Sequence, residues 1–130
     1  MWPVVRHWIV CEDVRYGDRP EQFTLSNVIC RIRALDPEPF PLLYRQLCFM
    51  ALCTECRGPA SIQVQIVEEG TAETCYESPE WSITFTNEPL RVHGFPFRIL
   101  NLQFPRPGIY SARFVYNSRI LAVEPLRLTE

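Results

Sequence analysis

Four cysteines near the middle of the chain have a spacing that could hold a metal or form a redox pair. Cys48, Cys53 and Cys56 follow a C-x4-C-x2-C pattern, and Cys75 lies downstream. Plant-type iron–sulfur proteins use this spacing, and Cys53 with Cys56 could also supply half of a zinc site or a reactive dithiol. However, an iron–sulfur cluster needs a loop that wraps it, whereas Cys48 lies in an apolar stretch that predicts a strand. Cys48 and Cys53 also have opposite parity, so along a strand their side chains point to opposite faces.

These cysteines have a simpler interpretation as buried apolar side chains, because free cysteine is among the residues most often found in protein cores. Structural zinc usually needs two such pairs, and the sequence shows no second pair and no nearby histidine. We therefore expect no cofactor. A small metal-binding or redox protein using the Cys48/Cys53/Cys56/Cys75 cluster, with metal at Cys53 and Cys56, is the alternative. A Cys53–Cys56 disulfide is disfavoured by a cytoplasmic location.

The remaining polar residues do not form a recognisable catalytic set. His7 and His93 are the only histidines, and neither a G-x-S-x-G motif nor a Cys–His signature is present. Glu68 and Glu69 read as solvated charges at a hairpin tip. The chain contains no lysine, which excludes a lysine Schiff base and a phosphate-loop lysine. The sequence thus predicts that the protein is not an enzyme.

The charge pattern argues against nucleic acid and membrane partners. The 130-residue chain has a net charge of −2, and its thirteen basic residues, all arginine, are scattered from Arg6 to Arg127. Such a balance gives no bulk attraction to nucleic acid or anionic lipid. The first residues do not resemble a signal peptide, and the longest apolar run, LCFMALC, is too short to cross a bilayer. We expect a cytoplasmic protein.

Short apolar runs separated by regular turn signals predict one all-β domain over residues 1–130. Twelve prolines and five glycines punctuate the chain, and no stretch has a convincing helical period. Residues 61–67 alternate most clearly, with Ile62, Val64 and Ile66 on one face. The run 46–53 is apolar on both parities, which fits a strand covered on both faces. We expect these two runs to pair as a hairpin.

Two of the predicted strands must change their buried face along their length. Residues 22–35 place apolar side chains first on one parity and then on the other, which predicts a bulge or break near Ser26 and Asn27. Residues 91–104 show the same change.

The end of the chain reads as a final hairpin. Tyr110, Ala112 and Phe114 share one face, and Asn117 and Ser118 form a two-residue turn, since Asn tolerates the positive φ that such turns require. The last strand, 120–128, places Leu121 and Val123 inward, and a bulge at Pro125 is expected to follow.

The stretch PGIYSAR, residues 107–113, resembles the entry to the penultimate strand of an immunoglobulin-type sandwich. In that family a Gly stands two residues before a Tyr whose hydroxyl hydrogen-bonds back to the chain; Gly108 and Tyr110 match. Ala112 stands where antibody domains have a cysteine, so their inter-sheet disulfide is absent. The resemblance implies an immunoglobulin-like antiparallel β-sandwich of about seven to nine strands.

A second resemblance covers most of the chain. WIVCEDVR at the start, FPLLYRQLCFMALC in the middle and LNLQFPRPGIYSARFVYNSRILAVEPLRL at the end are similar to a family of short uncharacterised bacterial proteins. This resemblance implies a fold and a bacterial origin but no chemistry. The predicted β-sandwich, the lack of a catalytic set of residues and the many aromatic residues favour a non-enzymatic module for protein–protein interaction or self-association, in which the partner is another protein or a second copy.

Overall fold

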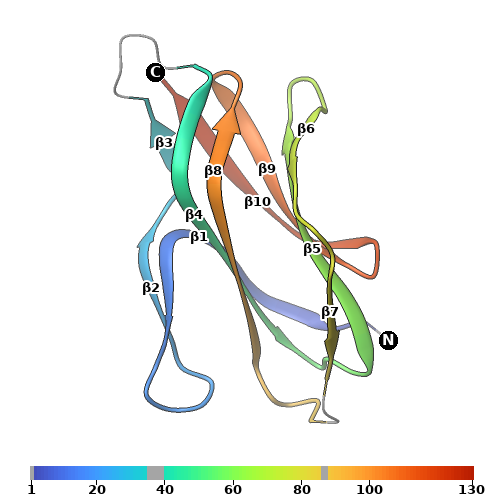
Figure 1. Ribbon diagram of the computed structural model, residues 1–130. Helices are drawn as coiled ribbons and strands as arrows, with labels where there is room; N and C mark the ends of the chain where they lie inside the picture. Colours follow the sequence, from blue (N-terminus) through green and yellow to red (C-terminus); the bar gives the residue numbers. More distant parts are fainter. Residues whose placement is uncertain (1, 35–39, 86–87) are drawn as a thin grey trace.

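The computed structural model describes residues 2–34, 40–85 and 88–130, and the described residues form ten β-strands in two facing sheets (Figure 1). This confirms the predicted all-β fold, with ten strands where about seven to nine were expected. The four-stranded sheet contains β1 (Val4–Tyr16), β2 (Phe23–Val28), β4 (Leu42–Thr54) and β8 (His93–Phe104). The six-stranded sheet contains β3 (Arg31–Arg33), β5 (Pro59–Glu68), β6 (Thr74–Glu77), β7 (Trp81–Thr84), β9 (Gly108–Tyr116) and β10 (Arg119–Thr129).

The strands pair mainly with partners distant in sequence. The smaller sheet has the order β2-β1-β4-β8, and the larger has β3-β10-β9-β5-β6, with β7 pairing with another part of β5. The pairing of β3 with β10 is parallel, and the other pairs are antiparallel. Because β8 is the last strand of its sheet, one of its edges faces away from β4.

The main core lies between the two sheets and follows the period-2 pattern of the sequence. Ile62, Val64 and Ile66 all point into it, as predicted. Trp8 of β1 joins the two layers, because its ring stacks on Phe49 of the same sheet while its Nε1 donates a 2.9 Å hydrogen bond to the Ala112 carbonyl of the opposite sheet. The indole N–H is therefore satisfied in an otherwise apolar interior.

The predicted hairpin between residues 46–53 and 61–67 is wrong. β4 pairs with β1 and β8, whereas β5 pairs with β9, β6 and β7, so the chain crosses from one sheet to the other between them. Strong alternation shows which side of a strand is buried but not which strand lies beside it.

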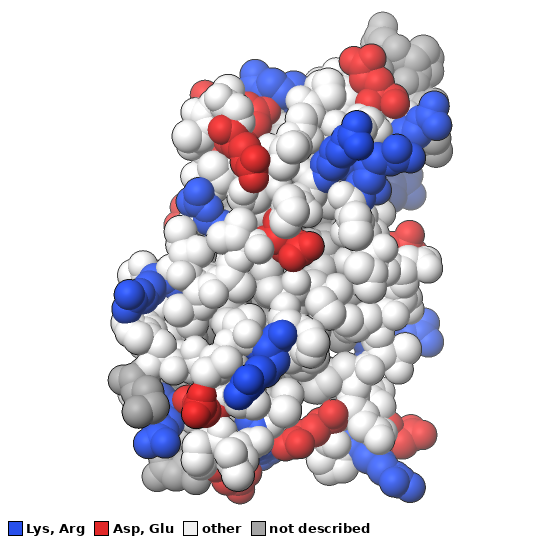
Figure 2. All heavy atoms as spheres, turned by 180° about the vertical axis from the view of Figure 1, so that it is seen from behind, with Lys and Arg blue, Asp and Glu red and all other residues white. Residues whose placement is uncertain are grey.

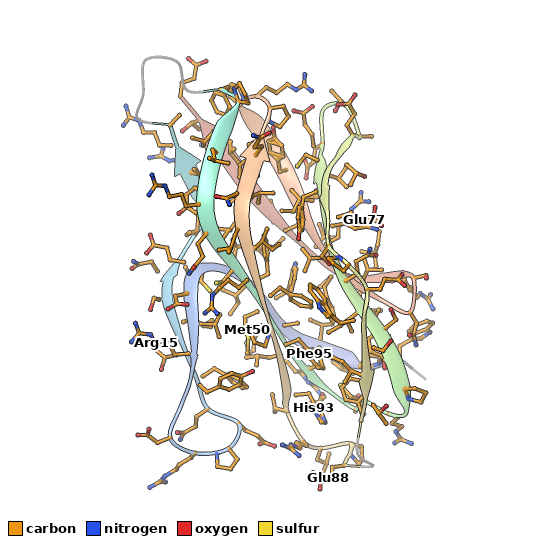
Figure 3. All side chains as sticks on the ribbon, viewed as in Figure 1. Arg15, Met50, Glu77, Glu88, His93 and Phe95 are labelled. Atoms are coloured by element: carbon orange, nitrogen blue, oxygen red, sulfur yellow. The ribbon has the colours of Figure 1, made fainter. Side chains whose placement is uncertain are left out.

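A second, smaller core explains why β4 is apolar on both parities. Cys48 and Met50 of β4 lie on the outer face of the four-stranded sheet and pack with Cys11 and Val14 of β1. Three partly buried side chains pack against this cluster: Phe23 and Leu25 of β2, and Leu52 of β4. Figure 3 labels Met50 among these side chains. The hairpin therefore folds over the outside of its own sheet.

The predicted changes of face occur, each by a different route. Asn27 has a φ of 50°, and the chain then leaves β2 for the other sheet, where β3 pairs with β10, so the break separates two sheets. In β8 the change falls at Asn101, with a φ of 56°, between the buried Ile99 and Leu102. β4 changes face along with β8, since their register is unbroken from Leu42 to Cys53.

The final hairpin is confirmed, but its bulge is not where it was expected. Asn117 and Ser118 have φ values of 47° and 64°, as the predicted two-residue turn requires. The register between β9 and β10 shifts between Ile120 and Ala122 and is continuous through Pro125. Because the shift comes early, Val123 points outward and is exposed rather than buried.

Candidate functional site

The fold separates the cysteines that the sequence places close together. Cys53, at the end of β4, and Cys56, after the following turn, are both wholly buried in the main core and interact with each other, and the Cys56 thiol donates a 3.9 Å hydrogen bond to the Thr54 carbonyl. Cys48 lies in the outer cluster, directly opposite Cys11 in the β1–β4 register. This confirms that Cys48 and Cys53 face opposite sides, and Cys75 lies elsewhere, on β6.

The described cysteines do not come together as a metal site with three or more protein ligands. All six cysteines lie in the described part of the chain and are free. Within residues 2–34, 40–85 and 88–130, no group of three or more His, Cys, Asp or Glu side chains could hold a metal ion. Cys53 and Cys56 remain as a pair of neighbouring sulfur atoms.

The two members of this pair differ in acidity. The interaction with Cys56, together with burial, raises the Cys53 pKa. The interaction with Cys53 lowers the Cys56 pKa against the opposing effect of burial. In the other close pair, burial raises the pKa of Cys11 to about 11 and also raises that of Cys48. Cys56 is therefore the one of these four thiols whose pKa is lowered.

The two histidines lie on opposite faces of the four-stranded sheet. His7 pairs with Leu52, which packs in the outer cluster, whereas His93 pairs with the core residue Cys53. The His93 ring packs edge-on against Phe85, and its buried Nε2 has no hydrogen-bond partner among the described atoms. Burial lowers the His93 pKa, and so does the nearby charge of Arg91. The two imidazoles thus do not share a site.

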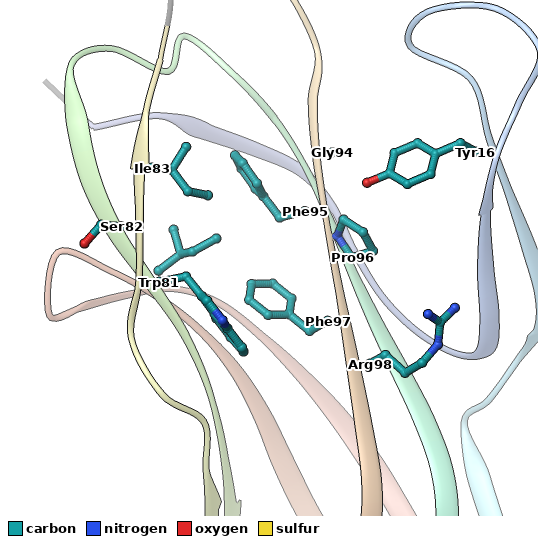
Figure 4. A pocket seen from close by; sticks show the side chains of 10 residues that line it. Tyr16, Trp81, Ser82, Ile83, Gly94, Phe95, Pro96, Phe97 and Arg98 are labelled. Atoms are coloured by element: carbon teal, nitrogen blue, oxygen red, sulfur yellow. The ribbon is translucent and has the colours of Figure 1, made fainter.

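A groove of about 500 Å³ follows the free edge of β8. Figure 4 shows Trp81 and Ile83 of β7 on one side of the β8 ribbon, with Tyr16 and Arg98 on the other. Trp81 is 41% exposed, and its ring packs 5.3 Å from that of Phe97 on β8. The sequence did not reveal this groove, because its lining comes from four strands, β1, β5, β7 and β8, that no local pattern places together.

A polar cluster at the start of β9 fixes one corner of the sandwich. The Tyr110 hydroxyl donates a 2.7 Å hydrogen bond to the Arg106 carbonyl, which confirms the backbone contact implied by the Gly108–Tyr110 spacing. Glu68 was expected to be solvated, but it is only 4% exposed and accepts hydrogen bonds from Arg106 Nε at 2.7 Å and Thr71 Oγ1 at 2.6 Å. These bonds hold the loops at this end together.

Arginines that are scattered in sequence come together at the edge formed by β3. Arg31 and Arg33 of β3 and Arg127 of β10 are all exposed, and the parallel register places Arg31 directly opposite Arg127. Figure 2 shows basic side chains gathered at this end of the molecule, with charges of both signs interspersed elsewhere on the same view. The arginines are thus scattered along the sequence, as noted above, but the fold brings three of them together.

No protein-family model matches the chain, and no curated protein matches it. The described residues include no helix with the length and apolar character needed to cross a membrane.

Proposed function

We propose that the protein is a non-enzymatic cytoplasmic β-sandwich module that binds another protein, and that an extended segment of the partner pairs with the free edge of β8. The single observation that carries this proposal is the combination of an unpaired strand edge, within the described residues, with a groove along it. Exposed strand edges offer unsatisfied backbone donors and acceptors. A peptide that adds a strand satisfies them and places its side chains in adjacent pockets.

The strand order supports an immunoglobulin-like arrangement as part of this proposal. Immunoglobulin constant-type sandwiches have strands A, B, E and D in one sheet and C, F and G in the other. Here β1-β4-β8 would correspond to A-B-E, and β5, β9 and β10 to C, F and G. The Tyr110 contact with Arg106 lies at the start of the strand that corresponds to F.

In that comparison the open edge of β8 is the position of strand D. β7 lies between β6 and β8 in the sequence, where strand D would be expected, but it pairs with β5 of the other sheet. The sheet consequently ends at β8. A partner strand would occupy the place that a D strand fills in the immunoglobulin arrangement.

The groove favours a partner segment with apolar side chains on one face. Alternate residues of a strand beside β8 would point toward the Trp81 and Ile83 side or toward the Tyr16 and Arg98 side. Pro96 lies in the middle of the β8 wall and cannot donate a backbone hydrogen bond. Pairing would therefore extend on either side of Pro96 rather than run continuously through it.

Further features of the chain support a non-enzymatic role, a cytoplasmic location and a bacterial origin. The histidines lie on opposite faces of a sheet, which favours a non-enzymatic role. Free cysteines are typical of a reducing compartment such as the cytoplasm. The resemblance to short bacterial proteins, carried by the stretches quoted above, supports a bacterial origin.

A selection from a library of displayed random peptides tests the binding function. We expect selected peptides to bind the wild type and to bind Trp81→Ala about 30-fold more weakly, because a central tryptophan typically contributes about 2 kcal/mol to binding. Trp2→Ala is the matched control: Trp2 is also 41% exposed but packs against Tyr116 and Arg119. Hydrogen exchange should show new protection of β8 amides in the complex.

Three outcomes would contradict the proposal. The selection could yield no binder, the binders could be insensitive to Trp81→Ala, or the β8 amides could exchange at the same rate with and without peptide. Light scattering on the free protein addresses self-association. A dimer that Trp81→Ala dissociates would show that a second copy, rather than another protein, occupies the edge.

A further inference from the structure

The turn between β4 and β5 carries two neighbouring thiols. Cys53, Thr54, Glu55 and Cys56 form a C-x-x-C segment, and Glu55 adopts a φ of 60° at the turn. The Cys53 and Cys56 side chains are both wholly buried in the main core and interact with each other, and the Cys56 thiol donates a 3.9 Å hydrogen bond to the Thr54 carbonyl. The neighbouring Arg57 is exposed and Glu55 is partly exposed, so the chain reaches the surface on either side of Cys56.

The molecule contains a second thiol pair that provides an internal comparison. Cys11 and Cys48 lie directly opposite each other on adjacent strands and are also buried. Thiol–disulfide exchange requires a thiolate. Cys11 and Cys48 lie within paired strands, whereas Cys56 lies in the turn after β4, outside any strand. The two pairs therefore differ in access, and the directions of the pKa shifts agree, since burial raises the pKa of Cys11 and Cys48 while the interaction with Cys53 lowers that of Cys56.

We propose that Cys53 and Cys56 are a redox-reactive dithiol, which a small disulfide of the glutathione class converts into an intramolecular disulfide. The Cys56 thiolate attacks one sulfur of the small disulfide, whose S–S bond breaks and releases one thiolate. The Cys53 sulfur then gives up its proton and attacks the Cys56 sulfur, releasing the second small thiol. In total, two protein thiols are oxidised to one disulfide while the small disulfide is reduced to two thiols.

Access to Cys56 comes from opening the turn. Two backbone hydrogen bonds anchor this turn: the Glu55 N–H donates to the Pro89 carbonyl at 2.7 Å, and the Phe85 N–H donates to the Gly58 carbonyl at 3.1 Å. Release of these bonds exposes Cys56 while Cys53 stays within β4. The resulting disulfide would constrain the segment that crosses between the two sheets, which makes this crossing sensitive to the redox state.

The first test uses the folded, full-length protein equilibrated in buffers with different ratios of reduced to oxidised glutathione. After an acid quench and alkylation under denaturing conditions, peptide mass mapping should show a Cys53–Cys56 disulfide at oxidising ratios and its loss at reducing ratios. The tryptic peptide Gln46–Arg57 also contains Cys48, so fragmentation must assign the bond. The proposal is overturned if Cys53 and Cys56 are fully alkylated at every ratio, or if Cys11 and Cys48 couple in their place.

The second test assigns the order of attack in a Cys30→Ser background, because Cys30 is exposed and would react by itself. Cys53→Ser, which keeps a polar hydrogen beside Cys56, should trap a single glutathione adduct on Cys56, whereas Cys56→Ser should leave position 53 unmodified. Cys48→Ala is the matched control and should form the 53–56 disulfide like the parent. An adduct on Cys53 in Cys56→Ser, with none on Cys56 in Cys53→Ser, would overturn the assignment of Cys56 as the attacking sulfur. The wild-type mapping remains decisive if a variant fails to fold.

Discussion

The Tyr110 hydroxyl joins the beginning of β9 to the turn that precedes it. It donates to the Arg106 carbonyl at 2.7 Å and lies 3.2 Å from the Glu68 carboxylate. We expect Tyr110→Phe to lower the free energy of unfolding by about 1–2 kcal/mol, because the hydroxyl is buried and its partners lose a hydrogen bond. Urea denaturation measures this. Tyr16→Phe, at a site that is 72% exposed, should match the wild type within error.

Glu68 should make the same corner sensitive to acid. The hydrogen bond from Thr71, followed by those from Arg106 and Tyr110, lowers the Glu68 pKa against the opposing effect of burial. Because the folded-state pKa is below the unfolded value of about 4.3, the stabilisation is complete above that value and is lost as the pH falls through the folded pKa. Glu68→Gln should be less stable than the wild type at neutral pH and should lose less stability between neutral pH and pH 3.

Urea unfolding at a series of pH values gives both profiles. Glu80→Gln, at an exposed position, should follow the wild-type curve. Parallel acid profiles for the wild type and Glu68→Gln would show that the Glu68 contacts make no difference to folding in the expected pH range.

At the scale of single residues, contacts between residues close in the sequence could be predicted, whereas contacts between distant residues could not. The contact between Tyr110 and Arg106 spans four residues, so the Gly108–x–Tyr110 pattern was sufficient to indicate it. The ion pair between Glu68 and Arg106 spans 38 residues, and nothing near Glu68 in the sequence shows that an arginine will cover it. Cys53 and Cys56 are an intermediate case, because their spacing indicated a pair but not which thiol would be the more acidic.

At the scale of elements, the β1–β2 hairpin depends on the absence of a side chain at Gly94. A Cβ at this β8 position would overlap the ring of Phe23 and lie 2.7 Å from Cε of Met50. We expect Gly94→Ala to destabilise the protein by about 1–3 kcal/mol through overpacking of the outer cluster. Thermal or urea unfolding measures the loss. Gly70→Ala, where a Cβ would meet nothing within 4 Å, is the control; equal effects of the two changes would contradict close docking of the hairpin.

The double-sided burial of β4 shows what periodicity can reveal about an element. The apolar run 46–53 correctly indicated a strand covered on both faces, since Phe49 lies in the main core and Met50 in the outer cluster. The run did not show which elements bury the two faces. One face packs against the opposite sheet and the other against the β1–β2 hairpin, and both are contacts with distant segments. The free edge of β8 was unpredictable for the same reason: its sequence does not say that β7 pairs with β5.

For the whole molecule, the two-layer architecture followed from alternation, but the connections between strands did not. Many short strands with period-2 burial can cover their apolar faces by packing one sheet against another. Many strand orders satisfy that pattern, and the observed order joins β1 to β4, β5 to β9 and β3 to β10. Each of these pairings closes a long loop of chain. The entropic cost of closing that loop must be overcome before the paired strands stabilise the fold.

This order predicts slow folding. Domains dominated by non-local strand pairs fold in milliseconds to seconds, and Trp8 is a suitable reporter, because it is buried between the sheets and hydrogen-bonds across them. In a Trp2→Phe, Trp81→Phe background, stopped-flow fluorescence should show refolding of Trp8 on this timescale. Trp8 reaches the Ala112 carbonyl only when β1 and β9 are both in place. Submillisecond recovery of the Trp8 fluorescence would therefore contradict the prediction that pairing of distant strands limits the folding rate.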